Sequence, residues 1–291
     1  MASFNKLILG TVQIGVSGYG INNSTKGLAE KESLDILSLA YNSGITTLDT
    51  AVAYGKAEKI IGKHHAENPN SSFRVITKIH PGDGVSVQDA LFNSLNNLNQ
   101  SGVDTLLFHS FDDFLRKKNS ITDLLKEIEK GRIKNIGVSV YTDSEARALL
   151  KYDYIDIIQL PFNLLDNLSL KGDLLEDIKL AGKSVHVRSV FLQGLFFKNL
   201  DLLPVFLEPL RLDLELLHSL SKQYQISMNQ MAMRYVLDQP LIDGVLIGVD
   251  SLAQLEENLD QIKNPLPEAL MARINGIKPS NQLLLNPVLW K

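Results

Sequence analysis

Short runs of apolar and β-branched residues alternate along the chain with longer segments whose apolar residues recur at helical spacing. The short runs contain few polar residues, as expected of strands buried on both faces in a parallel sheet. Consecutive runs are separated by enough residues for a helix. The eight candidate strands span residues 6–11, 44–50, 73–79, 104–110, 133–140, 154–161, 184–190 and 244–249.

The intervening segments carry the signals of helix ends. Three of them, residues 30–44, 85–102 and 120–131, end on a glycine, which commonly terminates helices because it tolerates a left-handed backbone. The segment 251–262 begins with Ser251, followed three residues later by Gln254. That spacing is typical of a capping box at a helix start. We therefore expect helices between the candidate strands.

Repeated strand–helix alternation predicts right-handed βαβ units that close into a (β/α)8 barrel, the TIM-barrel fold. No linker rich in Gly, Ser or Pro divides the chain, so we expect a single domain over residues 1–291. The longest interval between strands contains residues 191–213, a connection that could serve as a lid. A doubly wound sheet is the alternative, but no Gly-x-Gly-x-x-Gly motif follows the first strand.

Composition narrows the classes of function. The formal net charge of −4 gives no basic footprint for nucleic acid or anionic membranes. The chain has no cysteine, which excludes disulfides, a cysteine nucleophile and thiolate metal sites. His64 and His65 are adjacent on a predicted helix and point to different faces, so we expect no metal site. Without a signal peptide or ~18 unbroken apolar residues, we expect a cytoplasmic protein.

Polar residues stand at the carboxyl ends of the candidate strands, which meet at one face of a barrel. Asp49, Lys78 and His109 end the second, third and fourth strands, and Tyr54 follows Asp49 closely. A single strand-end Asp or His is more often structural than catalytic, but barrel geometry would direct all four groups to one point. The full set of strand-end residues is Thr11, Asp49, Lys78, His109, Ser139, Gln159, Arg188 and Gly248.

These four groups suit proton transfer to a carbonyl oxygen. A free phenol holds its proton at neutral pH, but a nearby ammonium favours the phenolate. A carboxylate keeps such an ammonium charged and oriented when it is partly buried, and an imidazole can donate to a carbonyl oxygen. Asp49, Tyr54, Lys78 and His109 would thus combine a tuned proton donor with an oxyanion site.

The order and spacing of several motifs resemble those of the aldo-keto reductases over most of the chain. The resemblance implies that Asp49, Tyr54, Lys78 and His109 are the catalytic tetrad, with Tyr54 as the general acid in reduction. The motifs that carry it are LDTAVAYG (48–55) with Glu58, ITK (76–78), LLFH (106–109), IGVS (136–139), IQLPFN (158–163) and LIGVDSLAQLEENL (246–259).

The same resemblance implies a nicotinamide cofactor. Ser139 and Gln159 would hold its carboxamide, the segment after the seventh strand would fold over its pyrophosphate, and residues 248–258 would surround its adenosine. Read alone, that last segment would be an ordinary capped surface helix. The implied cofactor-binding residues are Thr11, Ser139, Gln159, Arg188, Ser189, Leu192, Gly194, Lys198, Gly248, Ser251, Gln254, Glu257 and Asn258.

Three features depart from the family pattern. Val140 stands where the family often has Asn, and Arg188 where many members place an aromatic ring against the nicotinamide. The Arg188 guanidinium could stack in its place, or could bind a carboxylate or phosphate of an anionic substrate. Residues 249–262 contain no Lys or Arg to grip the 2′-phosphate of NADP, and Asp250 is acidic. Family habit favours NADP(H), while the missing cation leaves NAD(H) open.

We therefore expect an NAD(P)H-dependent oxidoreductase that reduces an aldehyde, ketone or sugar carbonyl by direct hydride transfer. A nicotinamide-binding accessory or sensor protein is one alternative. A Schiff-base lyase using Lys78 is another, which Asp49 disfavours by keeping the amine charged. Tyr19 in residues 15–23 and Trp290 in residues 283–290 could wall the substrate pocket. Nothing in the sequence indicates an oligomeric state.

Overall fold

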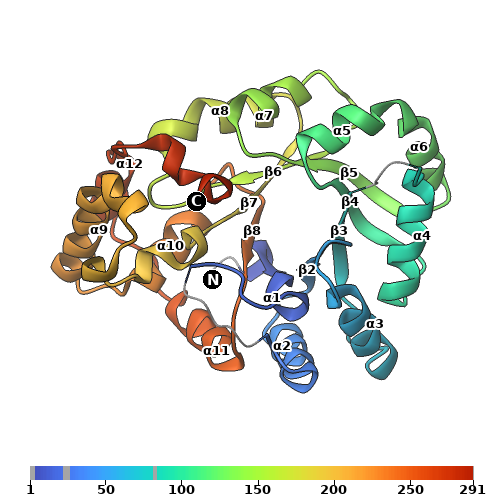
Figure 1. Ribbon diagram of the computed structural model, residues 1–291, viewed down its shortest axis with the longest axis horizontal. Coiled ribbons are helices and arrows are strands. Elements are labelled where there is room, and N and C mark those ends of the chain that lie inside the picture. Colours follow the sequence, from blue (N-terminus) through green and yellow to red (C-terminus); the bar gives the residue numbers. More distant parts are fainter. Residues whose placement is uncertain (1–3, 22–26, 81–83, 291) are drawn as a thin grey trace.

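The computed structural model describes residues 4–21, 27–80 and 84–290. In this part of the chain, eight parallel strands pair in chain order and the last closes on the first, with helices around them (Figure 1). The (β/α)8 fold is confirmed, and the closed sheet excludes the doubly wound alternative. The strands are β1 (Leu7–Gly10), β2 (Thr47–Asp49), β3 (Arg74–Ile79), β4 (Val103–Phe108), β5 (Ile133–Ser139), β6 (Ile157–Pro161), β7 (Ser184–Arg188) and β8 (Gly244–Ile247).

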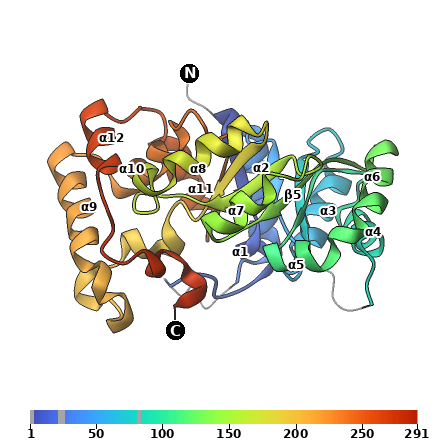
Figure 2. The ribbon, with the colours of Figure 1, turned by 90° about the horizontal axis from the view of Figure 1, so that it is seen from above.

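Helices and 3-10 turns connect the strands. Figure 2 shows α3, α4 and α6 on one side of the barrel and α9 and α12 on the other. The α-helices are α1 (Val12–Gly15), α2 (Glu30–Asn42), α3 (Ala57–Glu67), α4 (Val87–Leu98), α5 (Phe111–Lys117), α6 (Ile121–Glu129), α7 (Asp143–Leu149), α8 (Leu168–Leu180), α9 (Arg211–Tyr224), α10 (Met228–Leu237), α11 (Leu252–Gln261) and α12 (Glu268–Asn275). The 3-10 turns are η1 (Phe4–Lys6), η2 (Lys118–Ser120), η3 (Leu192–Phe197), η4 (Leu200–Leu202), η5 (Val205–Leu210), η6 (Gln282–Leu285) and η7 (Pro287–Leu289).

One predicted helix end lies elsewhere. The helix expected over residues 85–102 covers only Val87–Leu98, because Asn99 takes the left-handed conformation, with a φ of 52°, and ends it before Gly102. Asparagine tolerates this conformation better than most residues with a side chain. The predicted stop at Gly131 agrees with the structure, since α6 ends at Glu129 and Gly131 has a φ of 71°.

The barrel interior has an apolar layer that is separate from the main core. One side chain from each of five strands forms this small cluster. Side chains alternate along a strand, so residues two positions further on point to the same side. For β3 and β6 those residues are Lys78 and Gln159. A polar layer therefore lies on the apolar one at the carboxyl end of the barrel. The apolar layer consists of Ile8, Ile76, Leu107, Ile157 and Leu246.

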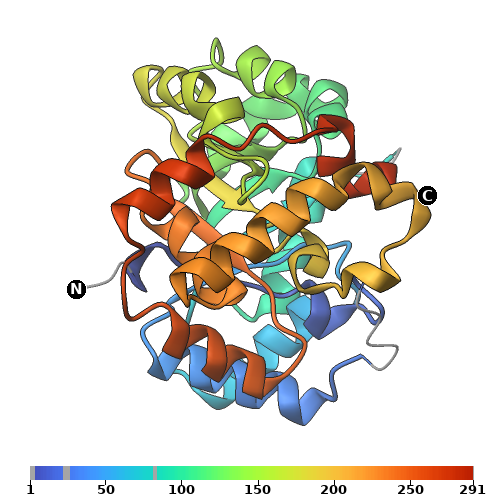
Figure 3. The same cartoon turned by 90° about the vertical axis from the view of Figure 1, so that its left-hand side faces the viewer.

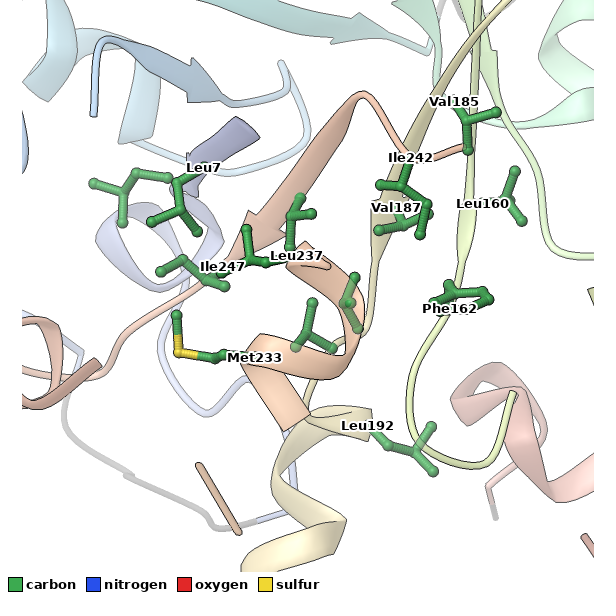
Figure 4. Packing of buried hydrophobic residues seen from close by; sticks show 14 of the residues in the cluster. Leu7, Leu160, Phe162, Val185, Val187, Leu192, Met233, Leu237, Ile242 and Ile247 are labelled. Atoms are coloured by element: carbon green, nitrogen blue, oxygen red, sulfur yellow. The ribbon is translucent and has the colours of Figure 1, made fainter. Parts of the chain in front are cut away.

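The main core fills the space between the strands and the surrounding helices. Figure 4 shows one part of it, where Val187 of β7 and Ile247 of β8 lie near Met233 and Leu237 of α10. The connection from β7 to β8 passes through η3, η4, η5 and α9 before it reaches α10. Figure 3 shows α9 lying across the outer side of the molecule, where it packs on α10. Among the helices of the described residues, none combines the length and the apolar character that a membrane-spanning segment requires.

Candidate active site

A buried ion pair lies at the carboxyl ends of β2 and β3. Lys78 Nζ donates to Asp49 Oδ1, and the two side chains are 2% and 3% exposed. Lys78 Nζ also donates to the Thr50 carbonyl oxygen at 3.0 Å, and Gln159 Nε2 donates to Asp49 Oδ2 at 2.9 Å. Burial acts to lower the pKa of Lys78, but Asp49 and Tyr54 raise it above its ordinary value. The lysine is therefore a fixed ammonium.

Tyr54 lies in the short loop between β2 and α3, directly beside this ion pair. Lys78 Nζ is 3.4 Å from Tyr54 Oη. The Tyr54 ring also packs edge-to-face on the His109 ring, with the two ring centroids 5.8 Å apart. The loop also packs closely on α1, since a Cβ on Gly15 would lie 1.7 Å from the Tyr54 carbonyl oxygen. Gly15 thus allows the chain after β1 to support the loop that carries the phenol.

His109 follows β4 and completes the cluster. Burial, and then the nearby Lys78 ammonium, lower the pKa of His109 to about 4. The imidazole is therefore neutral at physiological pH and has one N–H donor and one acceptor nitrogen. The structure brings Asp49, Tyr54, Lys78 and His109 into one contiguous group, as the strand-end pattern predicts.

A cavity of about 380 Å³ opens beside this group. Its volume is in the usual range for small-molecule sites. We call the part next to Tyr54 the tyrosine end and the part next to α10 and α11 the helix end. The tyrosine end is lined by residues from strand ends and from the Tyr54 loop, namely Asp49, Tyr54, Gln159 and Arg188. The helix end is lined by Asn229, Asp250, Gln254, Glu257 and Asn258.

Three buried amide oxygens on the cavity wall have no hydrogen-bond partner among the described residues. They belong to Gln13, Gln159 and Asn229. Buried polar groups are normally paired, so these oxygens indicate a ligand that donates hydrogen bonds. They lie after β1, on β6 and on α10, which spreads the open acceptors from the tyrosine end to the helix end. The cavity is therefore suited to an extended ligand with several donor groups.

Most of the predicted cofactor-binding residues line the cavity. They are Thr11, Gln159, Arg188, Ser189, Gly194, Gly248, Gln254, Glu257 and Asn258. Four others do not line it. Ser139 is paired in register with Gln159 on the neighbouring strand, and the Leu192 side chain belongs to the main core (Figure 4). Lys198 Nζ donates to the Ile21 carbonyl oxygen at 3.2 Å. Ser251 caps α11.

The sequence analysis missed several lining residues: Gln13, Phe191, Gln193, Phe197 and Asn229. Gln13 had a usable signal, because it comes two residues after the strand-end residue Thr11. Its amide lies against the cavity residue Gly248, where a Cβ would come within 2.6 Å of it. Asn229 had no such signal in the sequence, because it belongs to a helix that is distant in sequence from every strand-end motif.

Loops after β1 and β7 are joined next to the cavity. Ile21 N donates to the Gln193 carbonyl oxygen at 3.2 Å, next to the bond from Lys198. Gln193 has a φ of 53°, a left-handed conformation that the sequence of residues 191–213 does not indicate. Tyr19 lines the cavity as predicted, whereas Trp290 does not and instead donates to the Leu284 carbonyl oxygen at 2.8 Å. Residues 22–23 of the predicted wall lie outside the described residues.

Arg188 brings a positive charge to the tyrosine end. Its guanidinium carbon is 4.2 Å from the centre of the Tyr141 ring, and its Nη2 donates to the Val140 carbonyl oxygen at 3.0 Å. Among the described residues, no carboxylate forms an ion pair with it. The buried Asp166 is close enough to feel its charge, but that carboxyl pairs with Lys171. Arg188 can therefore stack on Tyr141 and still present charge to a ligand.

In the described residues, no group of three or more His, Cys, Asp or Glu side chains is placed to hold an ion. The sequence model of the Aldo/keto reductase family matches residues 6–279. Aldo-keto reductase YhdN of Bacillus subtilis (strain 168) is 27% identical, over 87% of this chain and 83% of that protein. The NADH-specific methylglyoxal reductase of Escherichia coli (strain K12) is 25% identical, over 91% and 95%.

Among solved structures, the holo form of aldo-keto reductase AKR11C1 from Bacillus halodurans has a similar fold. The TM-score is 0.74 at 20% identity, over 95% of this chain and 93% of that one. At this identity, the likeness supports the fold. The family model and the two curated relatives span nearly the whole chain, so the likeness is not confined to a local motif.

Proposed function

The chain belongs to the aldo/keto reductase family, and on that premise we propose that Tyr54 is the proton donor in its reaction. Family membership makes it an NAD(P)H-dependent oxidoreductase that reduces carbonyl groups of small molecules. The observation that carries the proposal is the buried ion pair of Asp49 and Lys78, with Lys78 Nζ 3.4 Å from Tyr54 Oη.

The cavity residues fit a nicotinamide dinucleotide. At the tyrosine end, the open Gln159 oxygen would accept from the carboxamide. The open Asn229 oxygen at the helix end would accept from the adenosine half. The segment around Gly194 would pass over the pyrophosphate. When bound, the nicotinamide supplies the hydride that the carbonyl carbon receives.

Proton transfer would run from Tyr54 Oη to the carbonyl oxygen. The negative charge left on the phenol oxygen is stabilised by the Lys78 ammonium, and water is largely excluded from this pair. Asp49 prevents Lys78 from losing its own proton, and Gln159 satisfies the second carboxylate oxygen. The phenol regains its proton from solvent after the alcohol leaves. The cluster thus delivers one proton per turnover.

His109 would orient the substrate rather than supply the proton. With a pKa of about 4 it is neutral during turnover, and its N–H can donate to the carbonyl oxygen as charge develops there. A neutral donor adds no second positive charge beside Lys78. The carbonyl oxygen would then meet two donors, the phenol and the imidazole, on the side away from the apolar layer.

The two alternatives explain less. A Schiff-base lyase needs a neutral amine, whereas Asp49 and Tyr54 raise the pKa of Lys78. An accessory or sensor protein would have no need for a proton donor beside a buried, fully paired ammonium. Trapping of a carbonyl compound on Lys78 with borohydride would favour the lyase, and cofactor binding without turnover on a broad carbonyl panel would favour the sensor.

The proposal is tested by Tyr54→Phe, with Tyr41→Phe as a control that removes a phenol on α2, outside the cavity. NADH and NADPH binding, followed by fluorescence, should be unchanged in both variants. Carbonyl reduction should fall by about 10²–10⁴-fold in Tyr54→Phe alone, as for a lost general acid. Undiminished reduction by Tyr54→Phe would overturn the assignment.

We further propose that the substrate carries a carboxylate or phosphate near its carbonyl, because Arg188 at the tyrosine end forms no ion pair with any carboxylate of the described residues. The test compares matched anionic and neutral aldehydes in Arg188→Met and Arg188→Lys. A lost charged hydrogen bond is worth about 1.5–3 kcal/mol, so kcat/KM for the anionic aldehyde should fall by about 10–100-fold in Arg188→Met. Equal losses for both aldehydes would show that Arg188 instead supports the nicotinamide.

A further inference from the structure

The helix end of the cavity is acidic. Asp250 and Glu257 line it together with neutral amides. Among the described residues that line the cavity, Arg188 at the opposite end is the sole Lys or Arg. Asp49 at the tyrosine end is neutralised by Lys78, so the unpaired charges on the described cavity wall are segregated, with the positive charge of Arg188 near Tyr54 and the negative charges of Asp250 and Glu257 near α11.

The orientation of a dinucleotide in this cavity follows from the proposed function. Its nicotinamide must lie at the tyrosine end, within reach of the Tyr54 proton, so its adenosine half extends to the helix end. NADP differs from NAD by a phosphate on the 2′-oxygen of the adenosine ribose, which carries between one and two negative charges at neutral pH. The helix end therefore decides between the two cofactors.

The N-terminus of α11 is the element that would ordinarily receive such a phosphate. Three backbone N–H groups at and just before this helix start are already engaged. Gln254 N donates to Ser251 Oγ at 3.2 Å, and Asp250 N donates to Gln254 Oε1 at 2.8 Å. Leu252 N, at the first helical position, donates to a carboxylate oxygen of Glu32 on α2 at 3.4 Å. An internal carboxylate from a neighbouring helix thus already lies where an anion would bind.

The Asp250 side chain is partly shielded from water. Burial raises its pKa, although the hydrogen bond with Gln254 acts in the opposite direction. A carboxylate in this position gains from uncharged donors such as ribose hydroxyls. It repels a phosphate, and the repulsion is stronger than in bulk water because the wall is only partly hydrated. The same acid therefore favours one cofactor and opposes the other.

We propose that Asp250 and Glu32 make this chain selective for NAD(H) over NADP(H). Asp250 accepts from the adenosine ribose hydroxyls, and Glu32 keeps the start of α11 closed to a 2′-phosphate. The preference is the reverse of the one that the family resemblance implies. It rests on the proposed function only for the direction in which the dinucleotide lies.

Binding, rather than turnover, gives the direct test. NADH and NADPH are titrated separately by fluorescence, and 5′-ADP and 2′,5′-ADP are compared by calorimetry as fragments that lack nicotinamide. The Kd for NADH should be at least about tenfold lower than that for NADPH, a difference of about 1.4 kcal/mol. The fragment without the 2′-phosphate should bind tighter by a similar factor.

Variants assign the preference to residues. Asp250→Arg should reverse or abolish the preference for NADH over NADPH. Asp250→Asn, which removes only the charge, should reduce the ratio of the two Kd values by about threefold to tenfold. Glu32→Gln should narrow it by a smaller factor. Asp173→Arg changes the net charge equally on an exposed part of α8 outside the cavity, and should leave the ratio unchanged.

Equal or tighter binding of NADPH by the unmodified chain would overturn the inference. So would an unchanged NADH-to-NADPH ratio in both folded Asp250 variants. A preference for 5′-ADP that persists without any NADH binding would leave selectivity at the helix end intact and count against the proposed function. Binding of none of the four nucleotides would overturn both.

Discussion

The two ends of the cavity differ in how their polar groups are satisfied. At the tyrosine end, both Asp49 oxygens have donors, from Lys78 and Gln159. At the helix end, the Asn229 oxygen is buried without a partner among the described residues. The ion pair that supports the proton donor at the tyrosine end is thus complete before any ligand arrives, as required for groups that act on a transition state, while the Gln159 amide oxygen beside it has no partner among the described residues. The helix end is completed by what binds there.

The difference follows from the elements that supply each end. Parallel strands in register fix the height and direction of Asp49 and Gln159, so these groups need no ligand to be positioned. Helices and loops supply the helix end, and their side chains meet only because α10 and α11 pack together. The ion pair beside the proposed proton donor is thus placed largely by strands, and the helix end by the packing of helices.

Lys78→Met, at the tyrosine end, should have the largest effect, which is a loss in the free energy of unfolding. The substitution leaves the Asp49 carboxylate buried with Gln159 as its remaining side-chain donor, and breaking a buried pair costs about 3–5 kcal/mol. Urea unfolding measures the loss. The double variant Lys78→Met, Asp49→Asn should recover much of it, since no charge is then left unpaired. A cost below about 1 kcal/mol in the single variant would mean that the tyrosine end is not preorganised.

Gly15→Ala tests the support of the phenol. A Cβ would clash with the Tyr54 carbonyl oxygen, so the loop must shift, at a cost of about 1–3 kcal/mol and with a fall in kcat. Thermal unfolding and steady-state kinetics measure both effects. Gly172→Ala is the matched control, because its Cβ would meet no atom within 4 Å on α8. Equal behaviour of the two variants would show that the loop is not held by this contact.

Gln13→Met sharpens the role of the open amide oxygens. In the protein without ligand that oxygen has no partner to lose, so the free energy of unfolding should change by less than about 0.5 kcal/mol. Dinucleotide affinity should fall by about fivefold, the value of one hydrogen bond. Fluorescence titration and urea unfolding measure the pair of effects. Loss of stability without loss of affinity would assign Gln13 to packing alone.

The smallest effect concerns histidines remote from the cavity. Burial lowers the pKa of both His64 and His65 on α3, so the folded chain keeps them neutral while the unfolded chain binds protons below about pH 6.5. Stability should therefore fall as the pH drops from 7.5 to 5.5. Over that pH range, the fall in Tm should be about 2 °C smaller in His64→Phe than in the unmodified chain. An unchanged pH dependence would exclude His64 as its source.

The barrel and the tyrosine end could be predicted from the sequence because both depend on a repeated local pattern. Each strand is an apolar run with a polar residue at its carboxyl end, and closure of the barrel brings Asp49, Lys78 and His109 together without further information. The helix end has no such pattern. Asn229 and Glu32 reach it through the packing of α10 on α11 and of α2 on α11, and no local signal reports helix packing.

The sequence predicted a long connection after β7 but not the path that its backbone takes. Leu192 was expected near the pyrophosphate, yet its side chain belongs to the core, in a segment where Ser189, Leu192 and Gln193 take left-handed conformations. Such conformations are uncommon for residues other than glycine and are not marked in the sequence. The roles of the cavity residues and the single-domain organisation stay predictions.

The most direct test of the central claim is single-turnover reduction of an aldehyde by NADH deuterated at the transferable position. Both the unmodified chain and Tyr54→Phe should bind the cofactor equally. The unmodified chain should place the deuterium on the carbinol carbon of the product, and Tyr54→Phe should do so about 10²–10⁴-fold more slowly. Equal rates in the two proteins, or an alcohol without deuterium, would contradict the account.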